Sequence, residues 1–270
     1  MMLLTLILLL LPPQSPPWPH SADSKPLGER LAPPAGFQRV PLEPGSFGAF
    51  LRALPAKAGH PPVRLYNGAL KNRQDVHAAV LDLDTGARNL QQCADAVIRL
   101  RAEYLWASGR SRAVLFHFTS GDEAAWSRWA EGWRPAIQGN SVHWSRAAAP
   151  DDSYRTFRTY LNKVFEYAGT RSLQKEMRPL KAGEAPAPGD VLVRGGSPGH
   201  AVILVDAVER PGTDERLYLL AQGYMPAQEI HVLNNLAEPG LGPWFRFPET
   251  GTIETPEWTF QREDLRRFPD

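Results

Sequence analysis

The segment between residues 188 and 206 limits the fold more than any other part of the chain. Val191–Val193 is a short β-branched run, and Ala201–Val205 is apolar throughout, which predicts a strand buried on both faces. The residues between the two runs favour a tight turn: Gly195, Gly196, Pro198 and Gly199. The pattern therefore predicts a strand, a short loop and a second strand, with His200 held where the loop enters the buried strand.

The overall composition is that of an ordinary globular protein with a near-neutral charge. Of 270 residues, 43% are hydrophobic and 22% are charged, and the formal net charge is +1. Proteins that bind nucleic acids or anionic membrane surfaces through basic clusters carry a marked excess of Lys and Arg. We therefore expect neither a nucleic-acid partner nor a polybasic membrane contact.

The N-terminus predicts export. Met1–Leu11 is almost entirely apolar, yet it is shorter than the roughly 20 residues that span a bilayer. It is typical of the apolar region of a secretory signal peptide. We expect a signal peptide over residues 1–22, a disordered Pro-rich linker over 23–36 and one folded domain over 37–270. No other segment is long and apolar enough to cross a membrane, so the expected location is periplasmic or extracellular.

Cys93 is the single cysteine of the chain. In an oxidising compartment, structural cysteines come in pairs. An unpaired cysteine in an exported chain is therefore a reactive thiol, an intermolecular bridge or a small buried hydrophobic residue. The count alone leaves these three interpretations open.

Hydrophobic spacing and capping residues predict an α+β fold. The clearest helix runs from Leu90 to about Ala107, with Asn89 as N-cap and Gln92 completing a capping box. Further helices are expected over 49–54, with Ser46 as N-cap, and over 122–133 and 153–168; strands are expected over 38–42, 63–66, 77–83, 114–119, 216–222 and 229–233, with 139–152 irregular. Because helices concentrate in the first two thirds and strands in the last third, α+β is favoured over a doubly wound parallel sheet.

Cys93 lies near the start of the predicted helix, where thiol chemistry is favoured. The free N–H groups and the dipole of a helix N-terminus stabilise a thiolate. Gln91 and Gln92 are adjacent and could donate hydrogen bonds to an oxyanion, as could backbone N–H groups. The alternative is that Cys93, which shares a helix face with Val97 and Leu100, is a core residue.

His200 is the best candidate for a base that would work with this thiol. If the strands on either side of residue 210 form a hairpin with Val205 opposite Leu217, Gln222 lies opposite His200. Antiparallel neighbours on one face are about 5 Å apart. Gln222 would then orient the imidazole, as the third member of a catalytic triad does.

Other features of the sequence support less specific interpretations. Trp126 begins a tryptophan stripe at helical spacing, which could form a sugar-stacking wall but is more often core. The histidines show no metal-ligand spacing, although His77, His200 and His231 could converge in space. The glycine-rich loop before His200 lacks the Lys-Ser/Thr pair of a phosphate loop. We therefore expect no metal and no cofactor.

The order of these pieces resembles the papain-like cysteine hydrolases of the cell-wall type, the NlpC/P60 and CHAP families. The matching pieces are a cysteine at a helix start (Cys93), Gly189-Asp190-Val191, Gly199-His200-Ala201-Val202-Ile203 and Gln222. The resemblance implies a papain-like core, in which the cysteine-bearing helix packs on an antiparallel sheet, with helical insertions. The spacing between Cys93 and His200 is longer than is usual in those families, and the residues around Cys93 depart from their cysteine motif.

Over about residues 37–268 the chain also resembles a bacterial exported family, domain of unknown function 4846. The resemblance is carried by several segments, among them Gly45-Ser46-Phe47-Gly48, Leu90-Gln91-Gln92-Cys93-Ala94-Asp95 and Ala221-Gln222-Gly223-Tyr224. That family brings no assigned activity. The residues themselves predict an exported thiol hydrolase that cleaves an amide bond, and the resemblance to the cell-wall hydrolases implies a peptide or peptidoglycan-like substrate. The alternative is a non-catalytic binding or structural module on the same scaffold.

Overall fold

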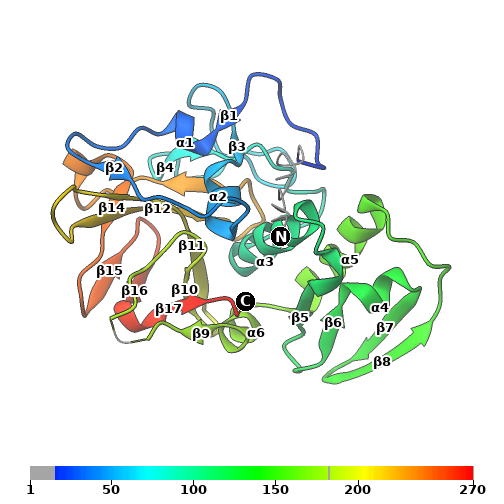
Figure 1. Cartoon of the computed structure of the whole chain (residues 1–270). Coiled ribbons are helices and arrows are strands. Elements are labelled where there is room, and N and C mark those ends of the chain that lie inside the picture. Colours follow the sequence, from blue (N-terminus) through cyan, green and yellow to red (C-terminus); the bar gives the residue numbers. More distant parts are fainter. Residues whose placement is uncertain (1–15, 182, 270) are drawn as a thin grey trace, which may run out of the picture.

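A computed structural model describes residues 16–181 and 183–269 of the protein. Its centre is a mainly antiparallel sheet with the strand order β4-β13-β12-β11-β10-β17-β9, to which β14 adds beside β12 and β2 beside β11 (Figure 1). The strands, in that order, are β4 His77–Val80, β13 His231–Leu233, β12 Arg216–Gln222, β11 His200–Glu209, β10 Val191–Arg194, β17 Leu265–Arg267, β9 Arg178–Pro179, β14 Trp244–Arg246 and β2 Gln38–Arg39.

The segment around residues 188–206 forms the middle of this sheet, as predicted. β10 and β11 pair antiparallel across the glycine loop, with Arg194 opposite His200. β12 has the predicted bounds, but the predicted register is wrong. Leu217 pairs with Val208 instead of Val205, and a bulge interrupts β11 between Leu204 and Asp206.

Both faces of β11 are buried, which confirms the prediction from its apolar run. Because side chains alternate along a strand, Ala201 and Ile203 join a core cluster that includes helix α3 (Cys93–Ala107). Val202 and Leu204 face the other way, into a second cluster formed by the C-terminal hairpin. That hairpin consists of β15 (Thr252–Glu254) and β16 (Thr259–Gln261).

The remaining elements lie beside the central sheet, and several of them extend the core cluster that includes α3. On the α3 side are α2 (Phe47–Arg52) and α6 (Thr170–Glu176). Ser46 caps α2, as predicted, and Ser153 caps α5 (Tyr154–Tyr167). Figure 1 shows a separate group to the right of α3: β5 (Leu115–His117), β6 (Glu123–Ala125), α4 (Trp126–Ala130), β7 (Trp133–Gln138) and β8 (Ser141–Arg146), with α5 above them.

The helix predicted over residues 122–133 is wrong over most of its length. It is replaced by β6, the short helix α4 and the start of β7. The segment predicted to be irregular contains β8, which pairs with β7 up to Gln138 opposite Ser141. The two residues between them are Gly139, with φ of +57°, and Asn140. Such a loop favours a tight hairpin, and this turn chemistry overrides the helical spacing of the tryptophans.

The N-terminal boundaries also require correction. Residues 23–36 were expected to be a disordered linker, but they contain β1 (Lys25–Pro26), paired with β3 (Pro55–Ala56), and helix α1 (Leu27–Arg30) with Leu27 buried. Of the expected signal peptide, residues 1–15 lie outside the described part. Trp18, inside its predicted bounds, is 2% exposed and donates from Nε1 to the carbonyl oxygen of Asp82 at 2.9 Å. Burial of apolar and aromatic side chains therefore extends the fold upstream.

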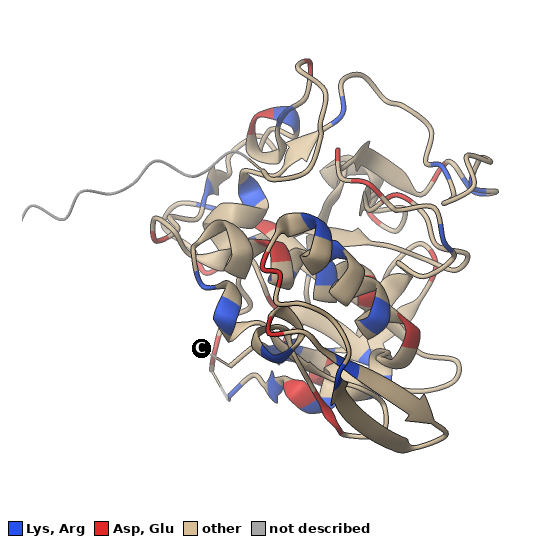
Figure 2. Ribbon diagram, turned by 90° about the vertical axis from the view of Figure 1, so that its right-hand side faces the viewer, with Lys and Arg blue, Asp and Glu red and all other residues tan. Residues whose placement is uncertain are grey.

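The architecture agrees with the predicted α+β class: a mostly antiparallel sheet with few helices, one of which carries Cys93. Within the described residues, no helix is long and apolar enough to cross a membrane. Figure 2 shows basic and acidic residues interspersed along the ribbon, in keeping with the net charge of +1.

Candidate active site

Cys93 is the first residue of α3, so the helix begins three residues later than predicted. The N-cap is Gln92, whose backbone N–H donates to Asp95 Oδ2 at 3.0 Å. Asn89, the predicted cap, instead accepts a hydrogen bond from the backbone N–H of Ala227 at 2.7 Å. The later start places Cys93 in the first turn, where backbone N–H groups lack partners within the helix.

The start of α3 meets the sheet where β11 begins and β12 ends. Gly223 directly follows β12, and a Cβ added there would lie 2.8 Å from the carbonyl oxygen of Gln92 and 3.1 Å from Ala96 Cβ. The thiol of Cys93 interacts with the backbone N–H of Ala201, the residue after His200. The structure therefore brings the cysteine to the strand end that carries the histidine.

His200 and Gln222 are in direct contact. His200 Nε2 lies 2.8 Å from Gln222 Oε1, and the two residues are 2% and 1% exposed. The last pair of the β11–β12 ladder is Ile203 with Ala221. Continuing that register, Gln222 lies opposite Val202 and reaches His200 diagonally on the same face, a spacing that long side chains can bridge. The predicted neighbours meet, although the predicted register was wrong.

Aromatic side chains enclose the imidazole of His200. The ring centroids of Tyr224, Trp258 and Phe260 lie 5.1, 5.4 and 5.9 Å from that of His200. The resulting burial lowers the pKa of His200 to about 4, against a smaller raising effect of the Gln222 hydrogen bond. The imidazole is therefore neutral at pH 7.

Cys93 is also neutral at pH 7. Burial, and then the Asp95 carboxyl, raise the pKa of the thiol to about 11, while the backbone N–H groups of Ala94, Ala201 and Cys93 itself oppose this effect. Within residues 16–181 and 183–269, no hydrogen bond joins the thiol to the imidazole. The resting site thus holds a thiol and an imidazole in their uncharged forms at the same end of β11.

A polar network lies behind Gln222. Its Nε2 is 2.7 Å from Glu257 Oε2 and 3.3 Å from His231 Nε2. Glu257 in turn forms an ion pair with Lys71, with Nζ 2.6 Å from Oε1. Lys71 also lies 4.9 Å above the ring centroid of Tyr224. Sequence reasoning missed Lys71 and Glu257, because isolated charges in separate loops give no local signal.

His77, His200 and His231 could converge according to the sequence, and the structure brings them into one neighbourhood. The rings of His77 and His231 are 6.3 Å apart, and Gln222 links His231 to His200. His77 Nε2 contacts the carbonyl oxygen of Pro61, and His231 Nδ1 that of Glu229. Among the described residues, no group of three or more His, Cys, Asp or Glu side chains could hold a metal ion.

Two predicted binding residues lie away from the thiol. Gln91 is fully buried, and its Oε1 accepts from Arg99 Nη1 at 3.0 Å within an internal ion-pair cluster. Trp126 is 1% exposed and packs against Trp106, Phe157 and Tyr160, which makes it a core residue instead of a substrate contact. Gln92 is half-buried at the start of α3, next to Cys93, and keeps its candidate role.

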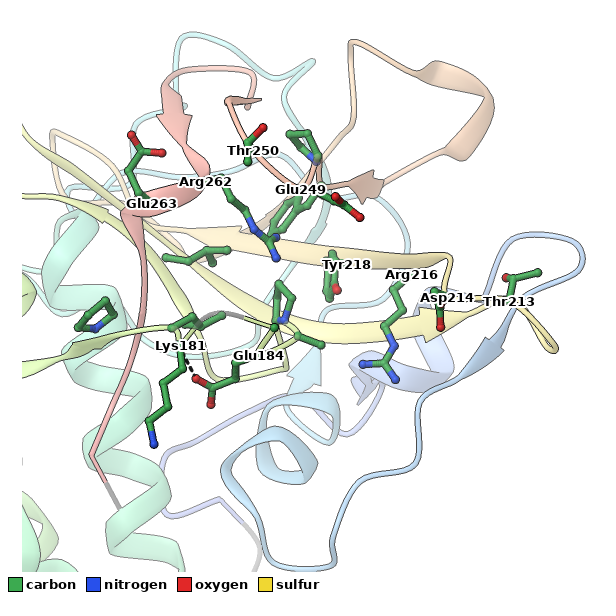
Figure 3. Close-up of a pocket in the computed structure, with 18 residues that line it drawn as sticks. Lys181, Glu184, Thr213, Asp214, Arg216, Tyr218, Glu249, Thr250, Arg262 and Glu263 are labelled. Atoms are coloured by element: carbon green, nitrogen blue, oxygen red, sulfur yellow. Dashed lines mark hydrogen bonds between the residues drawn. The ribbon is translucent and has the colours of Figure 1, made fainter.

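A cavity of about 960 Å³ lies elsewhere. Figure 3 shows it beside Arg216 and Tyr218 and beneath Arg262 and Glu249. Arg216 begins β12, and Gln222 ends it. Its wall has charges of both signs, and Glu184 is already paired with Arg178 and Arg267. None of the residues at the thiol–imidazole site lines it, so cavity size alone does not point to the candidate chemistry.

A match to one known family covers almost all of the described residues. A sequence model of the family described as domain of unknown function (4846) matches residues 27–267. The chain belongs to this family. The domain of unknown function 4846 therefore begins at α1, within the segment expected to be a linker, and contains all the site residues described above. No curated protein and no solved structure matches the chain.

Proposed function

We propose that the protein is an exported thiol hydrolase that cleaves an amide bond. Cys93 is the nucleophile, His200 is the general base and then the general acid, and Gln222 orients the imidazole. The observation that carries the proposal is the 2.8 Å contact between His200 and Gln222, made at the strand end that the start of the Cys93 helix touches. A thiol at a helix start, an imidazole and a polar orienting group are the components of nucleophilic catalysis by cysteine.

The neutral resting forms determine how the reaction begins. Because the pKa of Cys93 is about 11 and that of His200 about 4, a pre-formed thiolate–imidazolium pair is disfavoured. The thiol proton moves to His200 as sulfur bonds to the substrate carbonyl carbon. The oxyanion that forms is stabilised by backbone N–H groups at the start of α3 and by the amide of Gln92.

The remaining steps return the site to its resting form. The imidazolium of His200 gives its proton to the amine as the C–N bond breaks, which leaves a thioester on Cys93. Water then attacks the thioester with His200 as base, releasing the acid and restoring the thiol. Aromatic side chains around His200 exclude bulk water and keep the imidazole in place.

Cell-wall peptides are the proposed substrate class. The support is the order of Cys93, the Gly-His strand and Gln222, which resembles that of the NlpC/P60 and CHAP hydrolases, together with an N-terminal apolar segment typical of export. A papain-like core is part of the proposal. It is supported by the packing of α3 on β11 in an antiparallel sheet.

A non-catalytic module on the same scaffold is the second candidate. One observation favours it: burial raises the pKa of Cys93, and the thiol makes no hydrogen bond to His200 among the described residues. A small buried thiol of this kind is chemically quiet.

Hydrolysis of cell-wall fragments separates the two candidates. Purified protein is incubated with muropeptides, and released amines are quantified for wild type, Cys93→Ala and His200→Ala. His143→Ala, which alters an exposed histidine on β8, is the matched control. We expect release by wild type and the control and loss of at least about 100-fold in the two site variants. Equal release by Cys93→Ala contradicts the proposal.

A further inference from the structure

We propose that His231 and Glu257 are positioning residues that fix the amide of Gln222 and, through it, the tautomer of His200. The resulting imidazole carries its proton on Nε2 and leaves Nδ1 as the free acceptor. The inference rests on the proposed function only in assigning Nδ1 as the catalytic base. The tautomer itself follows from four hydrogen-bonding groups and can be measured without any substrate.

The first step concerns His231. Its Nδ1 lies 2.9 Å from the backbone carbonyl oxygen of Glu229, which accepts hydrogen bonds only, so Nδ1 carries the proton. Complete burial lowers the pKa of His231 to about 3, so the ring is neutral at pH 7. A neutral imidazole has one N–H, and Nε2 of His231 is therefore an acceptor.

The second step concerns Glu257. Its carboxylate is paired with Lys71, and the two side chains are only 9% and 6% exposed. A carboxylate accepts hydrogen bonds only. The inner end of the Gln222 amide thus faces two acceptors, Glu257 Oε2 and His231 Nε2. The NH₂ group of Gln222 can satisfy both with its two hydrogens, whereas its carbonyl oxygen would be repelled by both.

The third step transfers this orientation to His200. With its NH₂ group turned inward, Gln222 presents Oε1 to His200 Nε2 at 2.8 Å. Because an amide oxygen accepts only, Nε2 of His200 must be the donor. Burial keeps this ring neutral as well. The lone pair of His200 is therefore on Nδ1, and a reversed Gln222 amide would instead protonate Nδ1 and remove the base.

The chain brings this network together from distant segments. Lys71 and Glu257 are 186 residues apart, and Gln222 and His231 come from neighbouring strands that pair directly. A buried ion pair is weak evidence for stability, because desolvation offsets most of its attraction. The pair of Lys71 and Glu257 holds the Glu257 carboxylate against the Gln222 amide as a hydrogen-bond acceptor. This gives the ion pair a positioning role that is separate from stability.

Two-bond ¹H–¹⁵N correlation spectra of imidazole-labelled protein test the inference, because they report which ring nitrogen carries the proton. We expect Nε2–H for His200 in wild type, with its signals assigned by their loss in His200→Gln. Glu257→Gln replaces an acceptor by a group that can also donate, so the Nδ1–H form of His200 should become populated. Glu229→Gln is the matched control, since Glu229 also pairs with a lysine, Lys57, but its side chain does not touch Gln222.

The outcomes separate the inference from the proposed function. Nδ1–H in wild type, or a tautomer ratio unchanged in Glu257→Gln, overturns the inference. The wild-type spectrum alone reports the tautomer of His200, so this part of the test needs no variant. If Glu257→Gln does not fold, His231→Phe takes its place, because it removes the second acceptor of the Gln222 amide. The expected tautomers without any hydrolysis support the positioning network and refute only the proposed function. If hydrolysis is found, Glu257→Gln should lower kcat at least about tenfold with little change in KM.

Discussion

Gly223 and Gln92 fix how the cysteine helix meets the sheet. A Cβ on Gly223 would lie 2.8 Å from the carbonyl oxygen of Gln92, closer than a carbon and an oxygen can approach without a shift of backbone. Gly223 directly follows Gln222, and Gln92 directly precedes Cys93. Because glycine has no Cβ, Gly223 allows the start of α3 to approach the strand end closely. Gly223 therefore sets the distance between the proposed nucleophile and the strand that holds the imidazole.

Gly223→Ala should move the start of α3 away from β11 and β12. We expect a loss of about 1–3 kcal/mol in the free energy of unfolding, because overpacking in a buried contact has that cost. Any hydrolytic activity should fall further than the stability loss explains. Denaturant unfolding gives the first quantity. Gly240→Ala is the control, since a Cβ at residue 240 meets nothing within 4 Å. Equal stability of the two variants would show that the contact is not tight.

Trp18 should be part of the folded protein. Its ring is buried in the main core, and removal of a buried aromatic side chain costs about 3–5 kcal/mol. Trp18→Ala should therefore lower the midpoint of thermal unfolding strongly, and a chain that starts at residue 23 should be less stable than one that starts at residue 16. Trp133→Ala, at a half-buried position on β7, serves as the comparison.

The same reasoning predicts where an export signal would be removed. Cleavage after Ala22 would discard Trp18, so the processed N-terminus should lie before residue 18. N-terminal sequencing of the protein recovered from the periplasm or the medium checks this. A mature chain that begins at Asp23 and is fully stable contradicts both predictions.

Local sequence patterns predicted several elements, but they missed the β7–β8 hairpin and did not predict how the elements are placed relative to one another. The bounds of β12 and the cap at Ser46 were readable, because strand periodicity and N-cap chemistry act over a few residues. The start of α3 was missed because Asn89 is a strong N-cap by residue type, whereas in the fold its side chain accepts from the backbone of Ala227 instead.

The residues of the candidate site also fall into those with a local sequence signal and those that only the tertiary structure identifies. Cys93, His200 and Gln222 were found from their neighbours in the sequence. The register that joins His200 to Gln222 depends on a bulge at Val205, which the apolar run conceals. Glu257 and Lys71 reach the site through loops, and nothing in either loop signals that its charge is buried. Such residues are identified only when the fold brings them together.

Asp95 should make the stability of the protein depend on pH. Burial raises the pKa of its carboxyl from 3.8 to about 8. The folded state therefore binds a proton more tightly than the unfolded state, and the stabilisation is fully present below about pH 4 and is lost as pH rises to about 8. Asp95→Asn cannot ionise, so its stability relative to wild type should increase between pH 4 and 8, by on the order of several kcal/mol.

Urea unfolding at pH 5 and pH 8 measures this change. The lowered pKa values of His200 and His231 act in the opposite direction, since their neutral folded forms lose stability below about pH 6.5, but they are common to both proteins and cancel in the difference. Asp214→Asn, in an exposed turn, is the control. A constant difference between Asp95→Asn and wild type would mean that Asp95 ionises freely.

Alkylation of Cys93 should report the resting state of the thiol. With a pKa of about 11, the thiolate fraction and hence the iodoacetamide rate should rise about tenfold per pH unit from pH 7 to pH 10. The charge on Asp95 contributes to this raised pKa, so Asp95→Asn should shift the rate profile to lower pH. Mass spectrometry follows the single modified cysteine, with Asp214→Asn as the control. A rate already at its plateau at pH 7 would instead indicate a pre-formed thiolate, and the coupled proton transfer to His200 would then be wrong.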